Sequence, residues 1–297
     1  NLSANTWRQW LRWLAPVALL AVLAVAFRNE LGFLSEAFVA LRRAVATSPG
    51  PLVGAVIGAF GAIFAMAAVM MILLNVDAPR TNMMRTVALT LGSNAWSTSV
   101  PGGPALSAWL TYRVQRSWGA SNGLCGWFFV ISGALSTVWM VLIGLVAVVF
   151  LGASLSVTTL VSTLALTLLV IAGMFWATRN PDILTRWARY LPPSVRDRVT
   201  NVIQQVSQIR MSTGQFVTAA FFSLCNRLLD LVVLFFCVWA VLGTPPGTQP
   251  GLNEASLMGV TLAFIMTKLA GAAQVTPGGV GTVEAAADDS FVAAGMS

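Results

Sequence analysis

Long uncharged apolar runs dominate this sequence, and they restrict its fold more than any other feature. The run Pro51 to Leu74, PLVGAVIGAFGAIFAMAAVMMILL, contains no charged residue, and a helix that spans a bilayer needs about 20 such residues. Only 9% of the 297 residues are charged, whereas a soluble domain carries about 25%. The sequence therefore predicts an all-α, polytopic membrane protein, one integral membrane domain over residues 1–297 with about 6–8 transmembrane segments. The other apolar stretches are residues 10–27, 86–111, 123–151, 157–178, 215–242 and 255–275.

The triplet Pro-Gly-Gly occurs twice, once within the stretch 86–111 and once just after the stretch 255–275. Its copies are Pro101, Gly102 and Gly103, and Pro277, Gly278 and Gly279. Arginines lie on both sides of the first stretch, and cytoplasmic loops are rich in arginine, so we expect residues 86–112 to enter and leave on the cytoplasmic side as a re-entrant helical hairpin. The same counting predicts an opposed hairpin from the external side over residues 256–297. Broken helices at matching places in two halves of a chain are typical of transport sites; two tight turns at the membrane surface are the alternative.

The segment over residues 179–214 is polar and rich in arginine, and it is the strongest cytoplasmic signal in the chain. We interpret it as amphipathic helix on the cytoplasmic surface, where it binds anionic lipid headgroups or, alternatively, a partner protein. Counting spans backward from it places the N-terminus in the cytoplasm. Arg28, Arg42 and Arg43 do not fit, because they lie in a predicted external loop, where Glu30 and Glu36 partly offset their charge. The stretch LSEAFVALRRAV in this loop is a candidate interfacial helix.

Ionisable groups inside apolar spans are costly and are usually functional. Arg227 and Asp230 lie in SLCNRLLDLVV at a spacing that allows them to pair on one helical face. One interpretation is an internal ion pair that fixes helix packing. The other is that Arg227 binds a lipid phosphate, since guanidinium binds phosphate through two hydrogen bonds. Lys268 is the only lysine, and Glu284 is its expected partner if the lysine faces the protein interior.

The predicted lipid-binding set is completed by Arg113, at the mouth of the first hairpin. Simple anchoring of the helix end is the alternative for this arginine. The chain has no His, which removes the commonest metal ligand and general base. Cys125, Cys225 and Cys237 lack metal-ligand spacing and are expected to be packing residues. We therefore expect no catalytic residues, no metal and no cofactor. The net charge of +7 comes from arginines between apolar spans, which does not indicate nucleic-acid binding.

The stretches VPGGPALSAWLTYRV and LAGAAQVTPGGVGTVEAA resemble the two signatures of the lysylphosphatidylglycerol synthase transmembrane-domain family, the flippase-like membrane proteins. The run Thr276 to Gly281 followed by Glu284 is the more specific, and Asp230 also fits. The resemblance covers about Pro51 to Glu284 and implies a stand-alone member without the soluble synthase domain. Family members usually continue with apolar helix after the Glu, whereas AAADDSF is acidic and the sequence stops at Ser297, so we expect a partial chain or an unusual tail.

The resemblance implies an inner-membrane protein that binds or moves an envelope lipid. We therefore predict a flippase or translocator of an anionic or glycosylated envelope lipid in the bacterial inner membrane. Its partner would be a phospholipid or a lipid-linked sugar. The alternative is a non-transporting scaffold subunit of a cell-envelope synthesis or export complex, with a membrane-protein partner. A membrane transferase is disfavoured because no paired-acid motif or His is present, and a channel because no filter motif is visible.

Overall fold

Every regular element of the described chain is an α-helix, apart from one isolated bridge between Gly247 and Ser256. The computed structural model describes residues 31–100, 102–151, 156–188, 190, 192–247 and 256–272. The predicted all-α fold is thus confirmed for these residues. The helices are α2 (Leu31–Thr47), α3 (Pro49–Leu74), α4 (Met83–Ser99), α5 (Gly103–Ser117), α6 (Asn122–Leu151), α7 (Val157–Arg179), α8 (Pro181–Ala188), α9 (Pro193–Ser207), α10 (Thr213–Leu242) and α11 (Leu257–Ala272).

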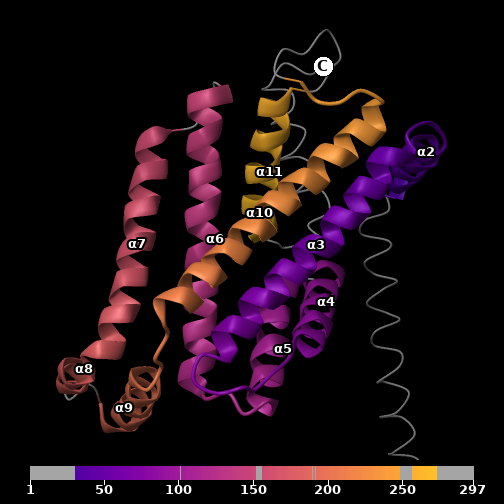
Figure 1. Ribbon diagram of the computed structural model, residues 1–297. Helices are drawn as coiled ribbons and strands as arrows, with labels where there is room; N and C mark the ends of the chain where they lie inside the picture. Colours follow the sequence, from indigo (N-terminus) through magenta and orange to yellow (C-terminus); the bar gives the residue numbers. More distant parts are fainter. Residues whose placement is uncertain are drawn as a thin grey trace, which may run out of the picture.

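Among the described residues, four helices, α3, α6, α7 and α10, are long and apolar enough to cross a membrane. They coincide within two residues at each end with four of the predicted spans. In Figure 1, α6 and α7 stand side by side, while α10 crosses in front of α6 and runs next to α3. The predicted span over residues 10–27 lies outside the described residues.

Small residues bring α3 and α10 into close contact. Gly54, Gly58 and Gly61 form a stripe on α3 that faces Leu229, Val233 and Phe236 of α10. A Cβ added at Gly58 would lie 3.0 Å from a methyl of Val233. Lipid chains are as apolar as leucine, so helices in membranes associate through such close packing rather than through the hydrophobic effect. The stripe therefore explains why α10 lies along α3.

The main buried cluster lies where the first half of α6 meets the end of α3. Trp127 and Ile131 of α6 pack with Leu73 and Leu74, and Phe175 of α7 meets the ring of Trp127 edge to face at 5.2 Å. Edge-to-face contacts of this kind add to the packing energy of aromatic residues. This cluster forms the core at one end of the bundle. The helical hairpin α4–α5 packs beside it.

Helices α4 and α5 form an antiparallel pair that is broken at the first Pro-Gly-Gly. Gly102 has a φ of +69°, the left-handed region that favours glycine. A Cβ on Gly103 would lie 2.2 Å from the carbonyl oxygen of Ser97. The two glycines thus have separate roles: one reverses the chain, and the other allows the backbone of α5 to touch the end of α4.

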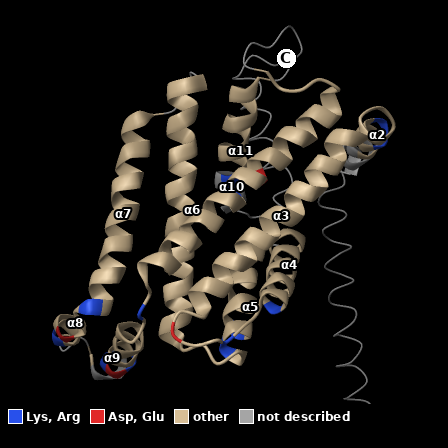
Figure 2. Ribbon diagram, viewed as in Figure 1, with Lys and Arg blue, Asp and Glu red and all other residues tan. Residues whose placement is uncertain are grey.

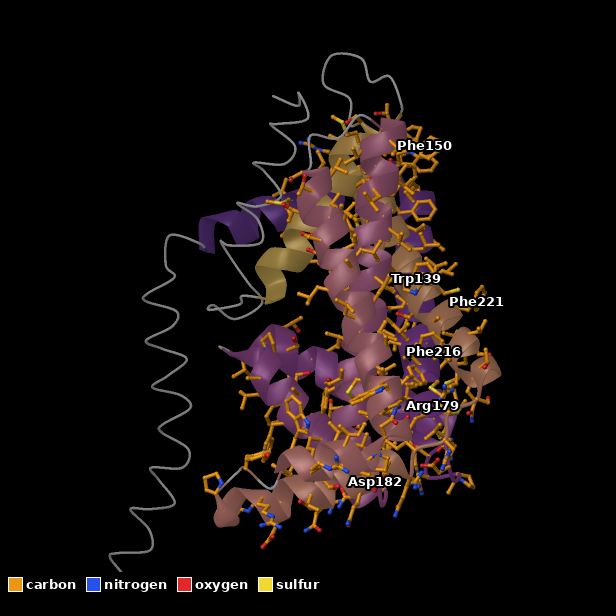
Figure 3. All side chains as sticks on the ribbon, turned by 90° about the vertical axis from the view of Figure 1, so that its left-hand side faces the viewer. Trp139, Phe150, Arg179, Asp182, Phe216 and Phe221 are labelled. Atoms are coloured by element: carbon orange, nitrogen blue, oxygen red, sulfur yellow. The ribbon has the colours of Figure 1, made fainter. Side chains whose placement is uncertain are left out.

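The α4–α5 hairpin and α11 approach each other from opposite ends of the bundle. Figure 1 shows that the hairpin stops well short of the far end of α6, while α11 starts at that far end and descends; the turned view in Figure 3 agrees. At 1.5 Å per residue, helices of 15 to 17 residues reach only about 25 Å. The second Pro-Gly-Gly and the predicted hairpin after residue 272 lie outside the described residues.

Charged residues gather at one end of the molecule. Figure 2 shows most of the described Lys and Arg near this end, on α8, α9, the end of α7, the beginning of α4, the end of α5 and the loops beside them. Figure 3 places Arg179 and Asp182 at this end, with Phe150 near the other and Trp139 between them. The predicted polar segment 179–214 is observed as the helices α8 and α9. The basic residues on α2 lie near the opposite end, as the sequence indicated.

Candidate functional site

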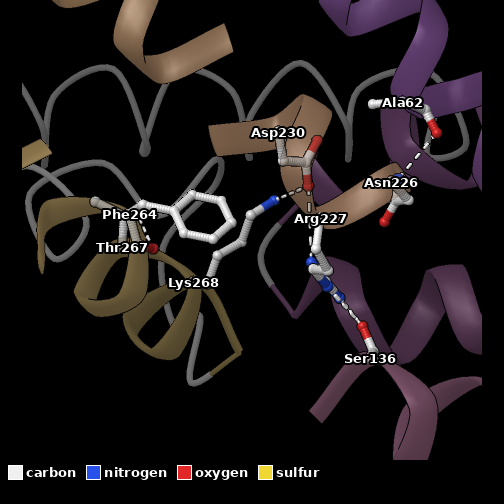
Figure 4. Close-up of polar contacts among 8 residues, drawn as sticks. All are labelled: Ala62, Ser136, Asn226, Arg227, Asp230, Phe264, Thr267 and Lys268. Carbon is white, nitrogen blue, oxygen red and sulfur yellow. Dashed lines mark hydrogen bonds and ion pairs between the residues drawn. The ribbon is translucent and has the colours of Figure 1, made fainter. Parts of the chain in front are cut away.

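Three charged side chains meet between α10 and α11. Asp230 Oδ2 lies 2.6 Å from Lys268 Nζ and 3.6 Å from Arg227 Nη1. Figure 4 shows the carboxylate between the two cations. Arg227 and Asp230 share a face of α10 because they are one helical turn apart, and α11 supplies the lysine from across the gap. Two cations therefore share one carboxylate. We call Arg227, Asp230 and Lys268 the charged triad; together they carry a net charge of +1.

The charged triad lies at the middle of the bundle. Arg227 is at the midpoint of α10, and its Nε donates a hydrogen bond of 2.7 Å to Ser136 Oγ at the midpoint of α6. The neighbouring Asn226 donates from Nδ2 to the carbonyl oxygen of Ala62, at the midpoint of α3, over 2.9 Å. Three long helices are thus tied together by polar contacts at their midpoints, and hydrogen bonds of this kind link helices in membrane proteins.

The charged triad lines a cavity of about 490 Å³, which we call the charged cavity. The side chains of Arg227, Asp230 and Lys268 are 21%, 24% and 37% exposed, so none is sealed in the protein. Apolar residues of α3 form the facing wall. The lining residues are Ala59, Ala62, Ile63, Met66, Asn94, Thr98, Asn226, Arg227, Asp230, Val233 and Lys268.

A second cavity, of about 260 Å³, lies in the α4–α5 hairpin and shares Met66 and Asn94 with the charged cavity. We call it the hydroxyl cavity, because its polar lining is neutral. Ser93 Oγ lies 2.6 Å from Ser107 Oγ and 3.2 Å from Thr111 Oγ1, which links the two helices. Its full lining is Met66, Met70, Thr90, Ser93, Asn94, Ser97, Pro104, Ser107, Ala108, Thr111, Phe128, Phe129 and Ser132.

An apolar groove of about 440 Å³ opens on another face of α10. Leu224, Leu228 and Leu231 of α10 line it together with Trp139 and Phe150 of α6. Their spacing of three to four residues places these leucines on one helical face. It contains almost no polar surface, so its chemistry suits lipid chains or another apolar helix.

The structure brings together three of the five predicted binding residues. Arg113 lies elsewhere: it is exposed on α5, with its guanidinium 5.1 Å from the centre of the Trp109 ring, and it does not line the charged cavity. Its contact with a headgroup stays a prediction. Glu284 and the second triplet, Pro277, Gly278 and Gly279, lie outside the described residues.

Two features of the site escaped sequence reasoning. The partner of Lys268 in the described chain is Asp230, 38 positions away, and nothing in the sequence connects these two residues. Ser136 is one of many hydroxyl residues in apolar helices, and only the packing of α6 against α10 shows that it holds Arg227. Considering only serines at the midpoints of the predicted spans would have reduced the number of candidate partners for Arg227.

The arrangement favours the binding of an anion. Guanidinium and ammonium groups bind phosphate through charge-assisted hydrogen bonds, and Asp230 keeps both cations in place when no ligand is bound. Within the described ranges, no three His, Cys, Asp or Glu side chains are grouped as metal ligands. The site can therefore attract and orient a negative group at the midpoints of the long helices.

A comparison with known protein families matches residues 11–297 to the family described as the lysylphosphatidylglycerol synthase TM region. The match extends over nearly all of the chain. No curated protein and no solved structure matches it.

Proposed function

We propose that this chain, which belongs to the lysylphosphatidylglycerol synthase transmembrane-region family, binds a lipid with an anionic or glycosylated headgroup and moves that headgroup across the membrane. The observation that carries the proposal is the charged triad in an open cavity at the midpoint of three long helices. Isolated charges at this depth are costly. A polar cavity with an excess cation lowers that cost for an anionic headgroup while its chains remain in lipid.

The two short helical features give the headgroup a route. In this proposal the α4–α5 hairpin is re-entrant from the cytoplasmic side, and α11 enters from the external side. Broken helices are tolerated at membrane depth where they line a cavity, and they frame the binding sites of many transporters. The charged cavity includes residues of both features, Asn94 and Thr98 on α4 and Lys268 on α11. Each feature would close one side of the path.

Charge distribution supports the orientation that we propose. The end formed by α8 and α9 would face the cytoplasm of a bacterial inner membrane, because arginine is enriched on that side of membrane proteins. The N-terminus would then also be cytoplasmic. The role is one of binding and transport rather than catalysis, and it requires no cofactor.

Translocation tests the proposal directly. The full chain is reconstituted in vesicles with a fluorescent anionic phospholipid, and the fraction that becomes accessible to a membrane-impermeant quencher is followed with time. Arg227→Gln and Lys268→Gln should each slow the exchange at least about tenfold, because each removes a charge-assisted hydrogen bond. Arg198→Gln removes the same charge from the exposed surface of α9 and is the matched control. Normal exchange in both cavity variants would contradict the proposal.

The scaffold alternative has its own outcome in a related experiment. The protein is extracted gently with its native membrane, and its lipids and proteins are identified by mass spectrometry. An enriched anionic or glycosylated lipid that is lost in Arg227→Gln supports transport. A stoichiometric protein partner with only bulk lipid would favour a scaffold that docks through the basic helices α8 and α9.

A further inference from the structure

Helix α8 lies across the end of α7 rather than continuing it. In Figure 1, α7 is seen from the side and α8 nearly end-on. α7 ends at Arg179 and α8 begins at Pro181, so only Asn180 separates them. At 1.5 Å per residue, the 23 residues of α7 cover about 35 Å, slightly more than the hydrocarbon core of a bilayer. If α7 spans the membrane, α8 therefore begins at the level of the lipid headgroups.

One face of α8 packs on the protein and another does not. Ala188 is buried, and α8 contacts α9 and the end of α7. Ile183 and Trp187 are one helical turn apart on a different face, and the side chain of Trp187 is 73% exposed. Tyr190, whose backbone N–H donates to the carbonyl oxygen of Trp187, is 90% exposed. We call Ile183, Trp187 and Tyr190 the α8 face; within the described chain it lies open.

The α8 face continues the exposed apolar surface of α7. Leu166, Leu169 and Trp176 of α7 are all exposed, and in a spanning helix such leucines contact lipid chains. Trp176 lies in the last turn of α7, and Trp187 and Tyr190 follow it along the chain. Tryptophan and tyrosine are enriched where hydrocarbon meets headgroups, because each combines an apolar ring with a polar N–H or O–H. The order leucine, then aromatic residues, matches the change from lipid chains to headgroups.

Two exposed arginines accompany the α8 face. Arg179 ends α7, and Arg186 lies in the last turn of α8. Neither arginine forms an ion pair with another described residue. Asp182 is the single acidic residue of α8. The stem of an arginine can lie along apolar surface while its guanidinium binds a phosphate. The α8 face is thus flanked by free cations that suit a surface of phosphates.

We propose that α8 lies in the headgroup layer of the membrane, with the α8 face in lipid and with Arg179 and Arg186 on the phosphates of anionic lipids. An amphipathic helix with aromatic residues on one face and arginines beside it binds membranes in this way. The partner is the lipid surface around the protein and not a transported ligand, so the inference does not depend on the proposed function.

The neighbouring helix α9 is held differently. Gln205 Oε1 of α9 accepts a hydrogen bond of 2.8 Å from the backbone N–H of Gly123 at the start of α6. A Cβ on Gly123 would lie 2.7 Å from Cβ of Gln205, so the two helices touch. Asn201 lies on the exposed polar side of α9. Protein contacts therefore fix α9, whereas lipid fixes α8.

Spin labels on the full chain in nanodiscs test the insertion of α8. A nitroxide is attached to Ile183→Cys or to Asn201→Cys in a chain whose native cysteines, Cys125, Cys225 and Cys237, are replaced by alanine. Oxygen concentrates in lipid, and a nickel chelate stays in water. The label at position 183 should collide with oxygen and be protected from the chelate, and the label at position 201 should show the reverse. Exposure of position 183 to the chelate would overturn the proposal and leave the α8 face for a protein partner.

Hydrogen exchange of the unmodified chain tests the charge and needs no cysteine replacement. The amides of α8 are compared in nanodiscs of phosphatidylglycerol and of phosphatidylcholine with the same acyl chains, and they should exchange more slowly in phosphatidylglycerol. Arg186→Gln should reduce this protection about fivefold, the contribution of one basic residue near an anionic surface. Arg85→Gln removes an exposed arginine from the beginning of α4 and should not alter it. Equal exchange of α8 in both lipids would overturn the proposed contact with anionic lipid, and this result decides if the cysteine-free chain does not fold.

Discussion

One helix, α10, lines two cavities of similar size and opposite chemistry. Asn226, Arg227 and Asp230 face the charged cavity, whereas Leu228 and Leu231 face the apolar groove. The two sets alternate in the short sequence SLCNRLLDLVV. Because successive residues of a helix are about 100° apart, neighbours in this sequence face different surroundings.

The difference shows how a charged group is kept inside an apolar bundle. On the charged side, every charged group has a partner: Arg227 has Ser136 and Asp230, and Asp230 has Lys268. On the groove side, lipid chains can fill the space at little cost, because they are as apolar as leucine. Substitutions on the two faces should therefore affect different properties, and to different extents.

The largest expected effect is that of Asp230→Asn, which leaves Arg227 and Lys268 as neighbouring cations without a counter-ion. Removing one partner of a buried ion pair costs about 3–5 kcal/mol, and partial exposure of this triad reduces the cost to about 2 kcal/mol. Unfolding of the detergent-solubilised protein, followed by scanning fluorimetry, measures the loss. Adding Lys268→Met to Asp230→Asn should restore part of the stability. An unchanged melting temperature in Asp230→Asn would show that the triad is not a structural unit.

The second-largest expected effect is on ligand binding, which should differ between variants on the two faces of α10. Arg227→Gln should weaken the retention of anionic phospholipid about tenfold or more, since a hydrogen bond to a charged group contributes about 1.5–3 kcal/mol. Leu231→Ala, one helical turn away on the groove side, should change it less than about twofold. Native mass spectrometry with phosphatidylglycerol gives both values. Equal losses in the two variants would mean that the groove and not the charged cavity holds the lipid.

A smaller effect is expected where the polar face of α10 contacts α3. Asn226→Leu keeps the size of the side chain and removes the hydrogen bond to the carbonyl of Ala62. Hydrogen bonds between membrane helices contribute about 0.6 kcal/mol on average, so the melting temperature should fall slightly and ligand binding should persist. A loss as large as that of Asp230→Asn would instead assign Asn226 a central part in the site.

The smallest effect is expected for Leu228→Ala in the apolar groove. Leucine-to-alanine changes in a water-excluded core cost about 2–5 kcal/mol because they leave a void. Leu228 is 42% exposed, and lipid chains can occupy the space that it vacates. We expect less than about 0.5 kcal/mol, measured by the same unfolding transition. A core-sized loss would indicate that protein rather than lipid covers the groove.

Much of the fold follows from composition and spacing. The long helices α3, α6, α7 and α10 were predictable to within two residues, because an uncharged run of that length has few other stable forms in a bilayer. The break between α4 and α5 was also visible, since Gly102 and Gly103 follow a proline. The local pairing of Arg227 with Asp230 followed from their spacing alone.

Contacts between helices were not predictable from one sequence. Ser136 and the carbonyl of Ala62 become part of the site only because α6 and α3 cross α10 at their midpoints. The hydroxyls of the α4–α5 hairpin likewise form a cavity only because its two helices lie against α3 and α6.

The sequence by itself determined which segments are helical, where the first hairpin breaks and which residues are charged within spans. These properties depend on local hydropathy, glycine conformation and spacing along one helix. The tertiary structure decided that Asp230 serves both Arg227 and Lys268, and that the charged cavity adjoins the hydroxyl cavity. The reason is that interhelical packing depends on the shapes of distant surfaces, such as the glycine stripe of α3 against α10, and no local pattern records which surfaces will meet.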